Sequence, residues 1–176
     1  MIPGMREEVI LQTAYAADRW TDFGVGVAGA AAALAGLVFV AVSINLSEIL
    51  KYRNLPGRAG LTLILFVTPL LTGILVLVPG QDRAALGGEL IAAGVFIGCS
   101  QLIINHRSGR SDQETRVTWI LARGAPPVVT CGCLVVAGAT LLAQAGGGLY
   151  WLVPSVISAL FFGLVNAWVL LVEILR

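Results

Sequence analysis

Ionisable side chains are scarce in this sequence, and one carboxylate, Glu89, falls well inside a long apolar stretch. Only 12% of the 176 residues are charged and 57% are apolar, whereas a soluble domain usually carries about 25% charged residues. A carboxylate in such a stretch is a candidate for binding an ion or a proton. Glu89 lies about five residues, or roughly 7 Å, from the end of its stretch. A second interpretation is therefore an interfacial anchor, with Arg83 close enough to neutralise it.

Amide side chains form a second candidate group, in the half of the apolar stretches opposite to Glu89. Gly94, Gly98, Gln101 and Asn105 follow one another at spacings of four, three and four residues, which places all four on one helix face. This face is too polar to contact lipid, so it is expected to form hydrogen bonds between helices or to line a polar vestibule. The candidate pore or polar cluster comprises Glu89, Gln101, Asn105, Asn45 and Asn166.

The sequence contains none of the usual catalytic or metal-binding patterns. His106 is the only histidine, which excludes sites that need several histidines from one chain. Cys99, Cys131 and Cys133 lie in apolar stretches, and a C-x-C pair without histidine does not have metal-site spacing. These cysteines are expected to pack as small apolar residues. We therefore expect no enzyme activity, no metal and no cofactor.

Small residues are concentrated in the first apolar stretch at the four-residue spacing that lets helix backbones approach closely. Gly26 precedes Ala30 by four residues, and Ala32 precedes Gly36 by the same interval. The contact can form within the chain or with a second copy, and the sequence does not separate these alternatives. The candidate helix-packing residues are Gly26, Gly29, Ala32, Gly36, Gly94 and Gly98.

Five apolar stretches are long enough to position these residues across a bilayer, since a helix needs roughly 20 residues to cross about 30 Å. They are continuously apolar rather than alternating, which favours helices over a barrel. The sequence therefore predicts an all-α polytopic bundle in a single membrane domain, 1–176. The predicted spans cover about 23–46, 60–78, 84–105, 124–143 and 149–172.

Basic residues predict the orientation, because cytoplasmic loops carry an excess of lysine and arginine. Loops 47–59 and 106–123 hold most of them, which places the C-terminus inside and the N-terminal segment 1–22 outside. Residues 5–22 are expected to form a short helix that lies on the outer surface or caps the bundle, or else a short solvated helix before the first span. Gly124 with Pro126 and Pro127 is expected to break or kink a helix before the fourth span.

Three segments in the first half of the chain resemble a group of small bacterial integral membrane proteins. They are AAALAGLVFVAVSINL at 31–46, LPGRA at 55–59 and LVPGQ at 77–81. Members of this group are often labelled as modulators of the membrane-bound ATP-dependent protease FtsH. The resemblance implies a bacterial cytoplasmic (inner) membrane address. Through that label, it also implies that segments 48–58 and 106–123 contact a protease acting on the cytoplasmic side.

Two functional hypotheses follow from these patterns. The first is a non-enzymatic membrane protein that acts by self-assembly, as a homo-oligomer, or by binding another membrane protein. The second is an oligomeric channel for an ion or small solute, with Glu89 at the outer mouth. The lipid bilayer is the expected surrounding in both cases. A net charge of +1 without a basic tract gives no support to nucleic-acid binding.

Overall fold

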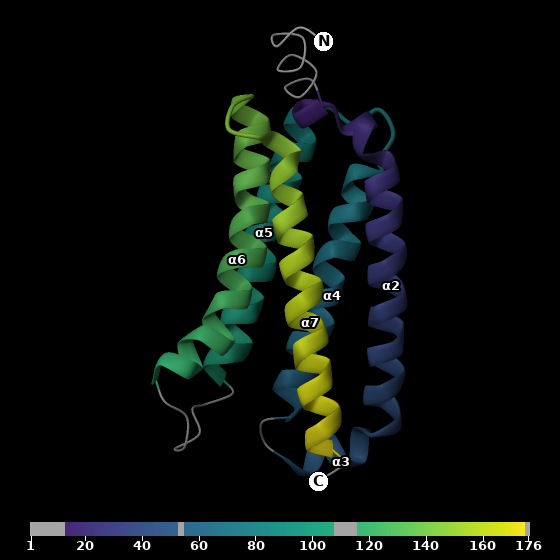
Figure 1. Ribbon diagram of the computed structural model, residues 1–176, viewed down its shortest axis with the longest axis vertical. Coiled ribbons are helices and arrows are strands. Elements are labelled where there is room, and N and C mark those ends of the chain that lie inside the picture. Colours follow the sequence, from purple (N-terminus) through teal and green to yellow (C-terminus); the bar gives the residue numbers. More distant parts are fainter. Residues whose placement is uncertain (1–12, 53–54, 108–115, 175–176) are drawn as a thin grey trace, which may run out of the picture.

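The computed structural model describes residues 13–52, 55–107 and 116–174, and within these ranges the chain forms a bundle of long helices (Figure 1). The five predicted spans are confirmed, because five helices are long and apolar enough to cross a membrane. The elements are η1 (Ala17–Trp20), α2 (Thr21–Ile44), α3 (Leu46–Lys51), α4 (Leu55–Val76), α5 (Arg83–Arg107), α6 (Arg116–Ala143), η2 (Gly148–Trp151) and α7 (Leu152–Ile174).

The long helices pack as neighbouring pairs rather than around one common axis. Helices α5 and α6 form the most extensive pair, α2 packs mainly on α4, and α7 joins α4 to α6. Figure 1 shows α2 at one edge of the bundle and the α5–α6 pair at the opposite edge. The chain enters at one end of the bundle and leaves at the other, as an odd number of spans requires. We call these the N-terminal and the C-terminal end.

Two apolar clusters hold the bundle together near its two ends. The larger cluster joins η1, α4, α5, α6, η2 and α7 and comprises Trp20, Val76, Leu86, Leu90, Leu134, Ala137, Leu141, Leu149 and Leu152. The smaller cluster, at the C-terminal end, comprises Ile49, Leu55, Ala59 and Leu170. Helix α3 contributes Ile49, which is 1% exposed, so this short helix is packed into the bundle.

The first span ends two residues earlier than predicted, because the chain turns at Asn45. The side-chain amide of Asn45 donates a hydrogen bond to the Ala41 carbonyl oxygen (2.9 Å), and its backbone N–H donates to the same oxygen. This side chain competes with continued helical bonding, as asparagine does at helix ends. Helix α3 then begins at Leu46.

The second span begins at Leu55, five residues before the predicted start at 60. Pro56 and Gly57 indicate a loop when the sequence is considered alone. Proline is favoured in the first turn of a helix, however, because the N–H it lacks has no partner there. The first turn of α4 therefore includes Pro56.

Of the predicted break or kink before the fourth span, the break is wrong, because α6 continues from Arg116 through Pro126 and Pro127 to Ala143. Figure 1 shows the first part of α6 bent away from the direction of the rest of the helix. The two prolines cannot donate to the carbonyl groups of Ala122 and Arg123, one turn earlier. Those carbonyls precede the apolar span, which starts at Gly124, and water at the membrane surface can satisfy them.

Candidate functional site

The outer face of α2 presents three glycines to open space. A Cβ atom built on Gly26, Gly29 or Gly36 would meet no atom of the described residues within 4 Å. Ala32 and Ala33 are exposed on the same side of the helix. Only 11% of the apolar stretch in this first span is buried, compared with 28 to 50% in the other four. We call Gly26, Gly29, Ala32, Ala33 and Gly36 the α2 outer face.

The opposite side of α2 makes the contact with the rest of the chain, through a glycine pair that sequence reasoning did not identify. A Cβ atom on Gly73 would lie 2.7 Å from the Gly24 carbonyl oxygen and 3.0 Å from the Cβ atom of Ala28. The backbones of α2 and α4 therefore touch at this point. Gly24 and Ala28 have the four-residue spacing of small residues. The sequence of α2 contains many pairs with this spacing, so this pair did not stand out.

Gly94 and Gly98, the other predicted packing residues, lie against α6. A Cβ atom on Gly94 would be 2.8 Å from a methyl carbon of Val135, and one on Gly98 would be 3.3 Å from the Cβ of Cys131. A second glycine pair, Gly87 and Gly138, brings the same two helices together nearer the N-terminal end, where a Cβ on Gly138 would lie 2.5 Å from the Gly87 carbonyl oxygen. Glycines thus set the separation of α5 and α6.

Gln101 and Asn105 are buried, with 1% and 7% of their surface exposed. The Gln101 amide nitrogen lies 4.0 Å from the Cys131 sulfur, which in turn lies 3.6 Å from the Thr130 hydroxyl. The Ser155 hydroxyl of α7 donates a hydrogen bond to the Thr130 carbonyl oxygen (2.7 Å). Buried polar groups thus link α5, α6 and α7, and Ser155 is a member that sequence reasoning missed.

The other predicted polar residues lie apart from this buried group. Glu89 is exposed on α5 and accepts a hydrogen bond from the side-chain amide of Gln81, in the turn between α4 and α5, and not from Arg83. Asn45 bonds to its own helix, as described above, and Asn166 is half-buried on α7. The five candidate pore residues therefore do not converge on one site within a single chain.

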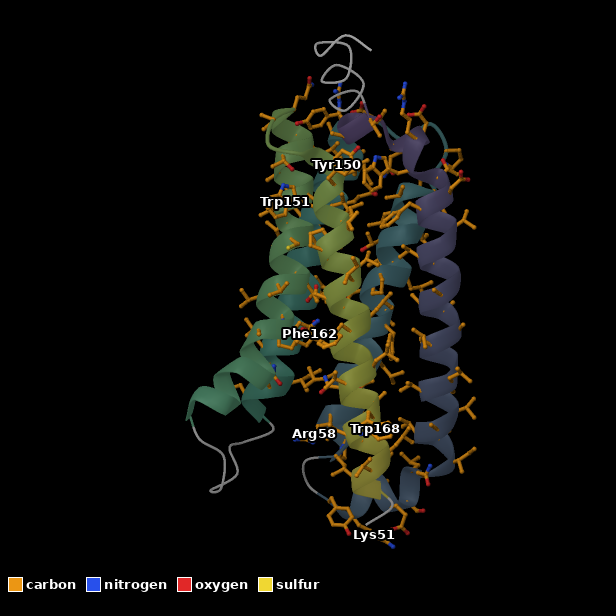
Figure 2. The ribbon with its side chains drawn as sticks, in the orientation of Figure 1. Lys51, Arg58, Tyr150, Trp151, Phe162 and Trp168 are labelled. Carbon is orange, nitrogen blue, oxygen red and sulfur yellow. The ribbon has the colours of Figure 1, made fainter. Side chains whose placement is uncertain are left out.

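The described part of the N-terminal segment caps the bundle. The Trp20 indole N–H donates to the Thr13 carbonyl oxygen (2.8 Å), and the Trp20 ring packs edge-on against Phe23 and Tyr150. A Cβ atom on Gly148 would lie 2.3 Å from the Ala14 carbonyl oxygen. Figure 2 shows Tyr150 and Trp151 at this end of the bundle. Residues 13–20 thus take the capping position, and the rest of the predicted segment lies outside the described residues.

Titratable groups do not gather into a metal site in the described part of the chain, where no group of three or more His, Cys, Asp or Glu side chains is found. Cys99 is exposed, Cys133 is half-buried and Cys131 is buried.

In α3, outside the spans, the Glu48 carboxylate accepts a hydrogen bond from Lys51 (2.6 Å), which raises the pKa of Lys51 above 10.5. Lys51 therefore keeps its positive charge near neutral pH.

Comparisons of the chain with protein-family models, with curated proteins and with solved structures find no match.

Proposed function

We propose that the protein acts by self-assembly in the membrane, and that the α2 outer face forms the contact between copies. The observation that carries this proposal is the open space at Gly26, Gly29 and Gly36 on the least buried of the five spans. Gly60, Gly88 and Gly132 are equally open, but each belongs to a different helix. Among the helices as far as the structure describes them, only α2 presents a row of open glycines.

Membrane helices associate by close packing, because lipid tails are as apolar as the side chains they would replace. Small residues at four-residue spacing let two backbones approach, commonly with a right-handed crossing near −40°. The same chain already uses glycine for this purpose where α2 meets α4 and where α5 meets α6. An equivalent surface that remains uncovered in one chain is suited to a second copy of itself.

The proposal extends to the surroundings of the protein. We place it in the bacterial cytoplasmic membrane as a non-enzymatic protein, with the basic loops 47–59 and 106–123 on the cytoplasmic side. A membrane-bound protease such as the one named by the resemblance would meet these loops. Self-assembly through α2 leaves them accessible, because they lie at the ends of the helices.

The experiment compares Gly29→Leu and Gly36→Leu with the unchanged chain, using native mass spectrometry of protein released from nanodiscs. We expect an oligomer for the unchanged chain and mainly monomer for both variants, since a leucine side chain would keep the two α2 backbones apart. Gly132→Leu is the matched control, because Gly132 is also an exposed helical glycine with open space around it but lies on α6. It should leave the oligomer unchanged.

Two results would contradict the proposal: a monomer for the unchanged chain at all protein-to-lipid ratios, or an oligomer that survives both α2 substitutions. Ion or solute flux through proteoliposomes, measured on the same samples, bears on the channel hypothesis. Flux that is lost in Glu89→Gln would favour a channel over assembly alone.

A further inference from the structure

One exposed carboxylate, Asp22, lies in line with the α2 outer face, one helical turn before Gly26. Asp22, Gly26, Gly29, Ala33 and Gly36 follow one another at intervals of four, three, four and three residues, and all five are exposed. A helix turns by about 100° per residue, so these intervals keep the five residues within about 40° of one line along α2. Asp22 therefore continues the row of small residues at the N-terminal end.

The charge of Asp22 is not neutralised within the described part of the chain, where the one ion pair found is that of Lys51 with Glu48. The Arg19 guanidinium, three residues away, donates a hydrogen bond to the Thr13 hydroxyl (3.3 Å). Near Asp22, the element packed on α2 is η1, whose ionisable residues are Asp18 and Arg19. In α3, α4 and α7, the ionisable residues lie at the opposite end of the bundle: Glu48, Lys51, Arg58 and Glu173.

Pairing of two copies through the α2 outer face determines what Asp22 meets. Both copies use the same face, so the contact is two-fold symmetric, and their common orientation in the membrane makes the two α2 helices parallel. Alternating intervals of four and three average 3.5 residues, the period that stays in contact along a left-handed crossing near +20°. Each residue of the row then faces its counterpart, and the two Asp22 carboxylates lie opposite each other.

We propose that two copies form a two-fold symmetric pair in which the two Asp22 carboxylates face each other, and that neutralising these carboxylates strengthens the pair. This inference rests on the proposed function and adds the regulation of the same contact. Packed helix axes lie about 8 to 10 Å apart, so the carboxylates are within the Debye length of about 10 Å at 0.1 M salt. Two unit charges about 7 Å apart, at an effective dielectric constant between 80 and 20, would weaken pairing about three- to fiftyfold.

The first test is Asp22→Asn, which removes the charge and nearly keeps the size of the side chain. Energy transfer between donor-labelled and acceptor-labelled copies in liposomes, measured over a range of protein-to-lipid ratios, gives the affinity of the pair. We expect Asp22→Asn to raise this affinity about three- to fiftyfold. Asp82→Asn is the matched control, because Asp82 is an exposed carboxylate at the same end but follows α4, on the other side of α2. It should leave the affinity unchanged.

Asp22→Lys tests whether the two positions face each other. Two lysines repel as two aspartates do, so this variant should pair with itself no better than the unchanged chain does. Mixed with the unchanged chain, it should form mixed pairs in excess of the statistical share, because opposite charges then lie at the contact. A mixture of Asp82→Lys with the unchanged chain should give the statistical share.

The unchanged chain supplies a further test, which stands even if Asp22→Lys does not fold. Aspartate side chains ordinarily protonate near pH 4, so lowering the pH from about 7.5 to about 4 should remove the repulsion and strengthen the pair. Asp22→Asn should lose this dependence on pH. Added salt at about pH 7.5 should also strengthen pairing of the unchanged chain, because it screens the repulsion.

Three results would overturn the inference: equal affinity of Asp22→Asn and the unchanged chain, a statistical share of mixed pairs with Asp22→Lys, or the same pH dependence in Asp22→Asn. An oligomer that Gly29→Leu abolishes and that no Asp22 variant alters would overturn this inference alone. A monomer for the unchanged chain at all protein-to-lipid ratios would instead contradict the proposed function.

Discussion

Glycine has two opposite roles at single positions of this chain. Gly73 lies against the backbone of α2, where even one added carbon would lie 2.7 Å from the Gly24 carbonyl oxygen, whereas Gly60 on the same helix has open space. In a membrane, the first kind of glycine fixes a helix separation. The second kind has no packing function within the chain.

This contrast predicts that Gly73→Ala destabilises the protein by about 1 to 3 kcal/mol, the usual cost of overpacking. The α2 and α4 backbones would have to move apart to accept the methyl group. Thermal unfolding in detergent, followed by circular dichroism, measures the change. Gly60→Ala is the control and should be neutral or slightly stabilising, because alanine is the better helix former. Equal stability of the two variants would show that the close contact contributes nothing.

Residue spacing predicted more about α5 than about α2. On α5, Gly94, Gly98 and Gln101 share one face because of their spacings of four and three residues, and all three lie against α6 or near Cys131. On α2, small residues occur on nearly every side of the helix. The sequence could not tell which side faces α4, because that side is defined by partner residues far along the chain, such as Gly73.

At the scale of elements, the described N-terminal segment and the turn before α7 depend on each other. Gly148 has φ +53°, and its missing side chain leaves space for the Ala14 carbonyl group and the Tyr15 ring. The Gly147 N–H donates a hydrogen bond to the Tyr15 hydroxyl oxygen (3.4 Å). The three consecutive glycines therefore follow the end of α6 and also provide the surface on which Ala14 and Tyr15 of the cap pack.

We predict that Gly148→Ala displaces the cap, because its methyl group would overlap Ala14 and Tyr15. Hydrogen exchange of the backbone amides in 13–20 should become at least tenfold faster. Gly80→Ala is the matched control, since Gly80 also has a positive φ (+67°) but has open space around it. It carries the same backbone strain without the overlap and should leave exchange in 13–20 unchanged. Equal acceleration in both variants would assign the effect to strain alone.

Element ends were harder to predict than the elements themselves. Five apolar stretches of sufficient length left little freedom in the number of helices. The ends depend on local hydrogen bonds such as that of Asn45 to Ala41, and on whether proline starts or interrupts a helix. Pro56 lies in the first turn of α4, while Pro126 and Pro127 are tolerated within α6, and sequence composition alone does not distinguish these cases.

At the scale of the whole molecule, the membrane-spanning helices place the two ends of the bundle on opposite sides of a membrane. Asp82 and the α4–α5 turn lie at the N-terminal end, and Ser47 of α3 lies at the C-terminal end. The distribution of basic residues predicts that the C-terminal end faces the cytoplasm. The bundle geometry alone does not depend on that assignment.

The orientation predicts that a membrane-impermeant thiol reagent labels Asp82→Cys in intact cells and labels Ser47→Cys only after permeabilisation. Both side chains are exposed and outside the spans. The unchanged chain measures any labelling of its own three cysteines, which lie within the spans. The reverse pattern would invert the topology, and labelling of both variants in intact cells would show that α4, which lies between the two positions, does not cross the membrane.

Helix α2 packs mainly on α4, which is synthesised after it. This order affects which contacts α2 can make during synthesis. Helix α2 leaves the ribosome first, and about thirty more residues must follow before α4 is complete. At 5 to 20 residues per second, this interval lasts about 2 to 6 s. During that time both small-residue sides of α2 are uncovered, so pairing of two nascent chains competes with the Gly24–Gly73 contact. If copies pair through the α2 outer face as proposed, neighbouring ribosomes on one messenger would favour this pairing before folding is finished.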